Sequence, residues 1–179
     1  MIRLLSISGS LRAGSSNSHL LGAAALLAPD GVVVQHYDVI SLLPHFNPDL
    51  EADLPAIIVD LRALVGEADG ILISCPEYAR GIPGSFKNML DWLVGSSEFP
   101  GKAVALFNTS PRASAAQTAL RLVLETMAAT VVEDACITLT LLGKQLDSDS
   151  IARDPASSET IRQALHAFVK HIKTTASLC

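Results

Sequence analysis

Residues 3–17 read RLLSISGSLRAGSSN, and the fold class follows from them. The first six, residues 3–8, are a short apolar run with the character of a β-strand, and residues 9–16 are a loop rich in Gly and Ser. An Ala- and Leu-rich helical pattern follows at residues 17–28. A strand, a tight loop and a helix in this order indicate the start of a βαβ unit, and therefore an α/β fold.

The same alternation continues along the chain. Further short apolar runs occupy residues 32–38, 70–74 and 103–107, with a weaker one at 130–139. Helical patterns lie at residues 54–68, 85–94, 116–127 and 161–172. Strands this uniformly apolar are typical of a parallel sheet covered on both faces. We therefore predict a flavodoxin-like, doubly wound sheet of five parallel strands in the order 2-1-3-4-5, as one domain over residues 1–179.

Composition excludes several classes of protein. The 179 residues carry a formal net charge of −5, with 49% hydrophobic and 17% charged residues. This acidic balance argues against a nucleic-acid partner, and no apolar stretch approaches the roughly 20 residues of a membrane span. The N-terminus lacks the apolar core of a signal peptide. Cys75, Cys136 and Cys179 are odd in number and far apart, which favours a reducing compartment. We expect a cytoplasmic protein without membrane partners.

Three loops are expected to meet at one edge of the sheet. Residues 9–16, 75–83 and 108–115 follow the first, third and fourth predicted strands. Ligands of open α/β sheets bind outside the carboxyl ends of the strands, so these loops predict the binding site. Residues 39–53 are also irregular, and the polar stretch 144–158 is interpreted as a solvated connection.

The first loop has the chemistry of a phosphate site. Glycines allow a tight turn, and the helix that follows offers free N–H groups. Arg12 adds a guanidinium, Asn17 is a natural N-cap, and further hydroxyl donors come from Ser10, Ser15 and Ser16. Ser15 stands where a P-loop has its lysine, and no G-x-G-x-x-G occurs. The alternative is a plain Ser/Gly turn with an exposed arginine.

Two motifs carry a resemblance to a known family. The first loop resembles the G-S-x-R-x-x-S-x-N phosphate loop of the NADPH-dependent FMN reductase family, which includes chromate and quinone reductases. Residues 76–92, PEYARGIPGSFKNMLDW, are similar to the P-E-Y-N-x-x-x-P-G-x-L-K-N-x-L-D-W signature of that family. Residues 101–104 and 116–121 resemble its third segment, and the likeness extends from residue 2 to about 132. It implies a flavodoxin-like fold, bound FMN, and homodimers or homotetramers.

The resemblance also implies roles for individual residues. The FMN phosphate would be held by Ser10, Arg12, Ser15 and Asn17, and the edge of the isoalloxazine ring by Pro76, Glu77, Tyr78 and Gly81. Ser16, Ala79 and Ser110 are also predicted to bind the cofactor.

Two departures from the family pattern concern the flavin. Ala79 replaces the usual Asn or His, and residues 108–114 lack the usual glycines. Either this third loop swings away from the site, or Arg112 reaches the phosphate-rich side and helps to attract NADPH. We expect FMN binding to be weakened.

The expected activity is electron transfer from NADPH or NADH through FMN to quinones, metal oxyanions or free flavin. No catalytic side chain is required, because the cofactor supplies the redox chemistry. The five histidines show no metal-ligand spacing. The alternatives are a flavodoxin-type electron carrier and a family member with weakened or lost FMN binding that acts as a binding protein. A net charge of −5 is modest for a carrier, which favours the enzyme.

Some side chains are given structural interpretations. Cys75 is interpreted as a small buried hydrophobe, Glu77 as a solvated loop residue, and Lys87 and Asp91 as an ion pair on one helix surface. The helix at 85–94 is apolar on nearly every side, so it is the predicted oligomer interface, through Met89, Leu90, Trp92 and Leu93.

Overall fold

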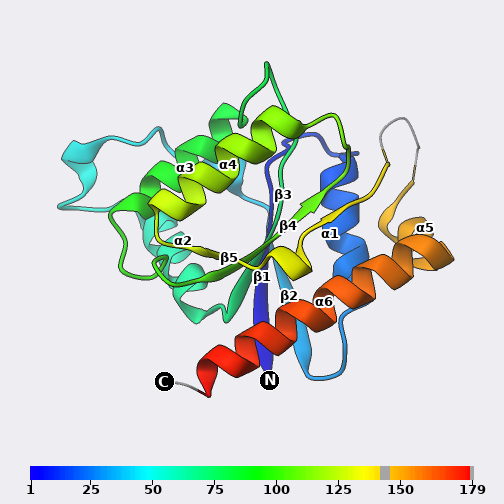
Figure 1. Cartoon of the computed structure of the whole chain (residues 1–179). Coiled ribbons are helices and arrows are strands. Elements are labelled where there is room, and N and C mark those ends of the chain that lie inside the picture. Colours follow the sequence, from blue (N-terminus) through cyan, green and yellow to red (C-terminus); the bar gives the residue numbers. More distant parts are fainter. Residues whose placement is uncertain (142–145, 178–179) are drawn as a thin grey trace.

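A parallel sheet forms the centre of the molecule in this computed structural model, which describes residues 1–141 and 146–177. Its strands are β1 (Ile2–Ser8), β2 (Val32–Tyr37), β3 (Gly70–Ser74), β4 (Ala103–Asn108), β5 (Thr130–Val131) and β6 (Ile137–Thr138). The order is β2-β1-β3-β4-β5, and every pairing is parallel. The predicted flavodoxin-like fold and strand order are therefore confirmed (Figure 1).

The fifth position of the sheet differs in detail from the prediction. Both β5 and β6 pair with β4, and a single turn of 3-10 helix, Glu133–Ala135, separates them. The run at residues 130–139 is thus two short strands. The turn buries Ala135 completely, which explains why the apolar pattern continues across the break.

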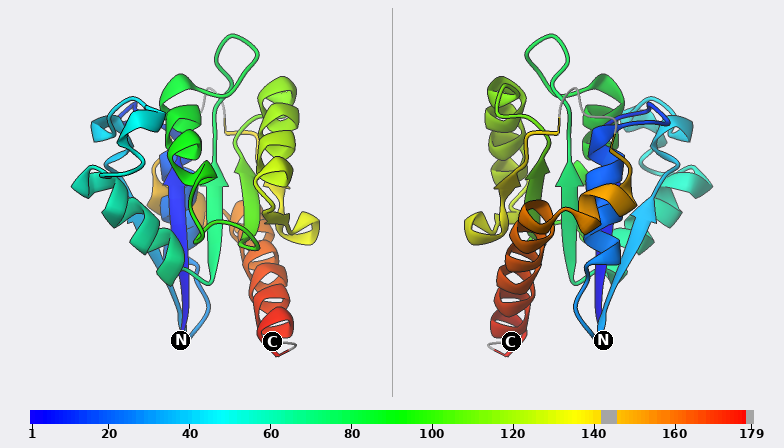
Figure 2. Two further views of the ribbon diagram at one scale, coloured as in Figure 1. Left: turned by 90° about the vertical axis from the view of Figure 1, so that its left-hand side faces the viewer. Right: turned by 90° about the vertical axis from the view of Figure 1, so that its right-hand side faces the viewer.

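Helices cover both faces of the sheet. They are α1 (Ser16–Leu26), α2 (Ala56–Glu67), α3 (Gly84–Val94), α4 (Ser114–Thr126), α5 (Ser148–Arg153) and α6 (Pro155–Ala176). One core cluster joins α2, α3 and α4 to the sheet, and a second joins α1, α5 and α6 to its other face (Figures 1 and 2). All five residues of β3 are buried, as a strand between two helical layers requires.

The interpretation of residues 144–158 as a solvated connection is wrong where the structure describes them. Residues 148–153 form α5, capped by Asp147 and carrying the fully buried Ile151. This helix lies against α1, because a Cβ on Gly22 would come within 2.2 Å of the Ser148 Oγ. One buried apolar residue in a single short helix leaves no periodicity to detect. Residues 144 and 145 lie outside the described residues.

The apolar side chains of α3 do not form the predicted oligomer interface. Met89, Leu90 and Trp92 are 0% exposed and Leu93 is 1% exposed, so all four belong to the core of the chain itself. The helix is apolar all round because the irregular segment 39–53 covers the side that a surface helix would show to solvent. That segment contains two 3-10 turns, Ile40–Leu42 and Pro48–Leu50.

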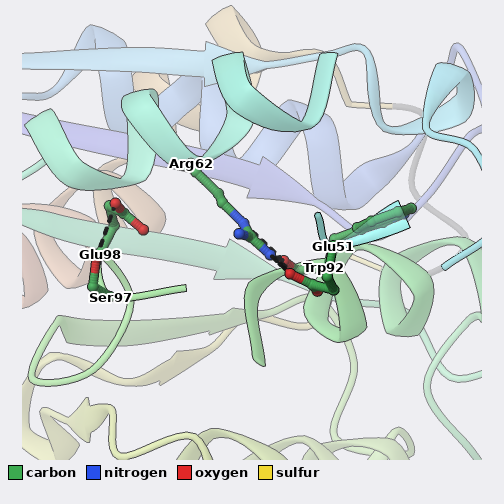
Figure 3. Close-up of polar contacts among 5 residues, drawn as sticks. All are labelled: Glu51, Arg62, Trp92, Ser97 and Glu98. Atoms are coloured by element: carbon green, nitrogen blue, oxygen red, sulfur yellow. Dashed lines mark hydrogen bonds and ion pairs between the residues drawn. The ribbon is translucent and has the colours of Figure 1, made fainter. Parts of the chain in front are cut away.

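Hydrogen bonds fasten the 39–53 segment to α2 and α3. The Pro44 carbonyl accepts from Trp92 Nε1 at 2.8 Å and from Asn88 Nδ2 at 2.9 Å. On the other side, Arg62 of α2 donates from Nη2 to the Trp92 carbonyl at 2.8 Å and to Glu51 (Figure 3). Asn88 and Trp92, both in the second motif, therefore position this segment.

Candidate functional site

The three predicted loops do converge at the carboxyl edge of the sheet. They enclose a cavity of about 310 Å³. Its lining residues are Ser10, Arg12, Ser15, Ser16, Asn17, Pro76, Glu77, Tyr78, Asn108, Thr109, Ser110, Arg112 and Ala113. Nine of the eleven residues predicted from sequence are among them, and only Ala79 and Gly81 are not.

Close backbone contact joins the first loop to the end of β3. Gly9 N donates to the Ser74 carbonyl at 2.8 Å, and a Cβ on Gly9 would lie 2.8 Å from Cys75 Sγ. A larger residue would push the two loops apart. Cys75 is 1% exposed, and burial raises the pKa of its thiol to about 12, so it stays protonated at neutral pH. This fits the interpretation of Cys75 as a small buried hydrophobe.

The start of α1 presents hydrogen-bond donors to the cavity. Ser15 is the N-cap, and its Oγ accepts from Asn17 N at 3.2 Å. Within the described residues, the backbone N–H groups of Ser15 and Ser16 have no protein acceptor. The exposed guanidinium of Arg12 makes one long hydrogen bond, from Nη2 to the Gly14 carbonyl at 3.4 Å. Free N–H groups beside an uncommitted guanidinium form an anion site.

Asn17 has a different role from the predicted N-cap. It is 6% exposed and lies inside the first turn of α1. Its Oδ1 accepts from Ser74 Oγ at 2.9 Å and from Thr109 Oγ1 at 3.4 Å. One side chain thus joins α1 to the last residue of β3 and to the loop that follows β4. Because Oδ1 is occupied, Nδ2 is the atom left to donate to a ligand.

The second loop ends in a tight hairpin that leads away from the cavity. Tyr78 and Gly81 exchange backbone hydrogen bonds at 3.1 and 3.0 Å, and the two residues between them have positive φ, 49° for Ala79 and 61° for Arg80. This is the geometry of a type I′ turn. The tip projects beyond the end of β3 (Figure 2). The turn therefore explains why Ala79 and Gly81 do not line the cavity.

Glu77 is a connecting residue, and its interpretation as a solvated side chain is wrong. Its Oε2 accepts from Ala116 N at 2.9 Å, in the first turn of α4. The N-cap of that helix, Ala113, has no side-chain acceptor to offer. Glu77 therefore caps α4 from another loop. In the sequence, the one indication of this contact is that residue 113, an alanine, has no side chain able to cap the helix that begins at residue 114.

The third loop stays at the cavity. Asn108 Nδ2 donates to the Ser110 carbonyl at 2.6 Å, and Ser110 Oγ accepts from Arg112 N at 3.2 Å. Thr109 Oγ1 also donates to Asn17 Oδ1 of α1 at 3.4 Å, and Ser110 and Arg112 line the cavity, so in this structure the loop does not swing away. Arg112 instead lines the cavity with Arg12, so two guanidinium groups border it. Sequence reasoning left Asn108, Thr109 and Ala113 out of the site.

Other predicted features are found outside the cavity. Lys87 and Asp91 form the expected ion pair on α3. In the ranges that the structure covers, no cluster of His, Cys, Asp and Glu could hold a metal ion. Over those same ranges, every helix is too short or too polar to cross a membrane.

Comparison with known proteins gives consistent matches. The sequence profile of a family described as NADPH-dependent FMN reductase matches residues 2–140. A 2-hydroxy-1,4-benzoquinone reductase from Burkholderia sp. is 37% identical over 112 residues, which cover 61% of each protein. An NAD(P)H-dependent FMN reductase from Pseudomonas aeruginosa is 38% identical over 112 residues, which cover 61% of this chain and 60% of the relative. The chain thus spans about 60% of the length of these relatives.

A solved structure resembles the whole chain. FerB, a flavoenzyme NAD(P)H:(acceptor) oxidoreductase from Paracoccus denitrificans, superposes with a TM-score of 0.78 at 27% identity, over 97% of this chain and 98% of that one. An NADH:FMN oxidoreductase in its apo form gives a TM-score of 0.66 at 24% identity, over 95% of this chain and 90% of the other, which supports the fold.

Proposed function

The chain belongs to the NADPH-dependent FMN reductase family, and from that premise we propose that it is an NAD(P)H-dependent oxidoreductase that uses FMN. Electrons would pass from the reduced nicotinamide through FMN to a small acceptor, such as a quinone, a metal oxyanion or free flavin. The quinone reductase and FMN reductase among its relatives support this acceptor class.

The observation that carries the proposal is the set of donors at the start of α1. Ser10, Arg12 and Ser16 would bind the FMN phosphate, together with the N-cap Ser15 and the free Nδ2 of Asn17. The orphan N–H groups of a helix N-terminus and an unpaired guanidinium suit a dianion. The residues present therefore fit the phosphate of FMN.

The other side of the cavity would position the flavin ring. Pro76, Glu77, Tyr78 and Ser110 line it, and Glu77 holds the second loop at a fixed distance from α4. FMN, when bound, supplies the hydride and electron transfer chemistry. These residues would hold and orient the edge of the ring, and no catalytic acid or base is needed.

We further propose that the protein acts in the cytoplasm as a homo-oligomer. Cys75 and Cys136 are free thiols, which suits a reducing compartment. A mean hydropathy of +0.38 with only 17% charged residues supports association, through surfaces other than the buried residues of α3.

The test is a visible absorbance spectrum followed by turnover. The purified protein should show flavin bands or take up added FMN, and should then oxidise NAD(P)H when a quinone is present. Arg12→Ala should weaken FMN binding by roughly 1.5–3 kcal/mol, the scale of a charge-assisted hydrogen bond. Arg162→Ala, an exposed arginine on α6, is the matched control and should change nothing. A protein that never binds FMN would instead act as a binding protein.

A further inference from the structure

A second, larger cavity lies on the other side of the first loop. Its volume is about 460 Å³. It is bordered by the ends of β1 and β2, by α1 and by Ser148 of α5. Among its lining residues are Ser6, Ser8, Ser18, His36, Asp38 and Ser41. Nothing in the proposed handling of FMN uses these six residues.

Ser6 lines this cavity and contacts both the Gln35 carbonyl and the ring of His36. Ser6, which is 1% exposed, donates its single hydroxyl proton to the Gln35 carbonyl at 3.3 Å. Its oxygen also lies 2.5 Å from His36 Nδ1. With the Ser6 proton directed at the Gln35 carbonyl, this contact is a hydrogen bond from Nδ1–H of neutral His36 to Ser6 Oγ. The Nε2 atom of the exposed ring is then a hydrogen-bond acceptor.

A second acceptor stands beside His36 at the end of β2. Asp38 is exposed and lines the cavity, and within the described residues its carboxylate makes no hydrogen bond or ion pair. Among the lining residues that the structure describes, Arg12 is the only lysine or arginine, and it lines both cavities. Two acceptors next to a guanidinium suit the hydroxyls of a ribose and the phosphate attached to it.

We propose that this cavity binds the adenosine half of the nicotinamide co-substrate and that Asp38 makes NADH preferred over NADPH. The inference rests on the proposed function. Asp38 and His36 accept hydrogen bonds from the ribose hydroxyls, and the diphosphate crosses the first loop at Arg12 to reach the FMN cavity. In the dinucleotide-binding members of the doubly wound class, an acidic residue hydrogen-bonds the free 2′-hydroxyl of NAD in the same way. A 2′-phosphate would bring two negative charges against the Asp38 carboxylate, with no second lysine or arginine among the described lining residues to offset them.

The direct test is calorimetric titration with two probes that lack the nicotinamide, ADP-ribose and 2′-phospho-ADP-ribose. The wild-type protein should bind ADP-ribose at least about tenfold more tightly. Asp38→Asn should weaken ADP-ribose binding about fivefold or more and bring the two affinities within about threefold of each other. His36→Phe should weaken both probes. Asp30→Asn, an exposed acid just before the other end of β2, is the matched control and should bind like the wild type.

Turnover separates this proposal from the proposed function. N-benzyl-1,4-dihydronicotinamide has no adenosine half, so Asp38→Asn should lower kcat/KM for NADH relative to kcat/KM for this compound. If the benzyl compound reduces FMN but ADP-ribose does not bind at millimolar concentration, the cavity assignment is wrong and the proposed function stands. Equal or tighter binding of 2′-phospho-ADP-ribose to the wild type also overturns it. Titrations repeated without FMN decide the assignment even if the protein proves to bind no flavin.

Discussion

Tyr37→Phe is expected to make the protein more resistant to alkali. Tyr37 ends β2 with 5% of its surface exposed, and its hydroxyl is buried without a hydrogen-bond partner in the part of the chain that the structure describes. Burial first, and then the carboxylates of Asp60 and Asp38, raise the pKa of Tyr37 to about 12. The phenolate is therefore disfavoured in the folded state.

The sign and size of the effect follow from this pKa. An unfolded tyrosine titrates near pH 10, so between pH 10 and 12 the folded state holds a proton that the unfolded state has lost. The free energy of unfolding of the wild type therefore falls as the pH rises. At pH 11 the contribution of Tyr37 to this fall is about 1.4 kcal/mol, and it is smaller where solvent screens the two carboxylates. At pH 7 the free energy of unfolding of Tyr37→Phe should equal that of the wild type or exceed it by up to about 1 kcal/mol, because an unsatisfied buried hydroxyl is removed.

Urea unfolding at pH 7, 9, 10 and 11, followed by the fluorescence of the buried Trp92, measures the difference. The raised pKa of Cys75 lowers the stability of both proteins above pH 9 and cancels in the comparison. Tyr78→Phe, at the only other tyrosine, which is 53% exposed, is the control and should follow the wild type. If the free energies of unfolding of Tyr37→Phe and the wild type fall by the same amount between pH 9 and 11, the reasoning is refuted.

Three further predictions concern the candidate site. Glu77→Ala should destabilise the protein by about 1 kcal/mol in urea and weaken FMN binding, because the cap on Ala116 N is lost; Glu77→Gln, which keeps an acceptor, should lose less. Ala79→Asn should raise stability by roughly 0.5–1 kcal/mol, since Asn tolerates the φ of 49° better, and FMN affinity should not change. FMN should dissociate during gel filtration and restore activity when added back, because Pro111 gives the third loop no N–H; a stoichiometric, salt-resistant complex would contradict this.

The order of the sheet could be predicted because its central strands are short and buried on both faces. β3 and β4 are buried at every residue, so their apolar runs stand out from the helical patterns. α5 could not be predicted in the same way, since only Ile151 of its six residues is buried. Its place depends on contact with Gly22 of α1, more than a hundred residues earlier, which no local pattern reports.

The same distinction holds within the site. The convergence of the three loops follows from topology alone, because parallel strands place their carboxyl ends on one edge. The hydrogen-bond partners of Asn17 and Glu77 could not be predicted in this way, because each of these side chains bonds to residues distant in sequence. A sequence motif identifies residues such as Asn17 and Glu77, but it does not say which atoms their side chains hydrogen-bond. The position of Ala79 is the converse case, since two positive φ values in succession turn a motif residue away from the cavity.

These bonds divide the site into a fixed part and a free part. Asn17 joins α1 to the last residue of β3 and to the loop after β4, and Glu77 joins the second loop to α4. The phosphate end and the base of the ring site are therefore assembled by the protein's own contacts before any ligand arrives, which lowers the ordering cost of binding. Within residues 1–141 and 146–177, the hydrogen bonds of the hairpin tip are those of its own backbone pair, Tyr78 and Gly81. Substitutions at Ala79 and Arg80 in the tip should therefore leave FMN binding unchanged, while those at Asn17 should weaken it.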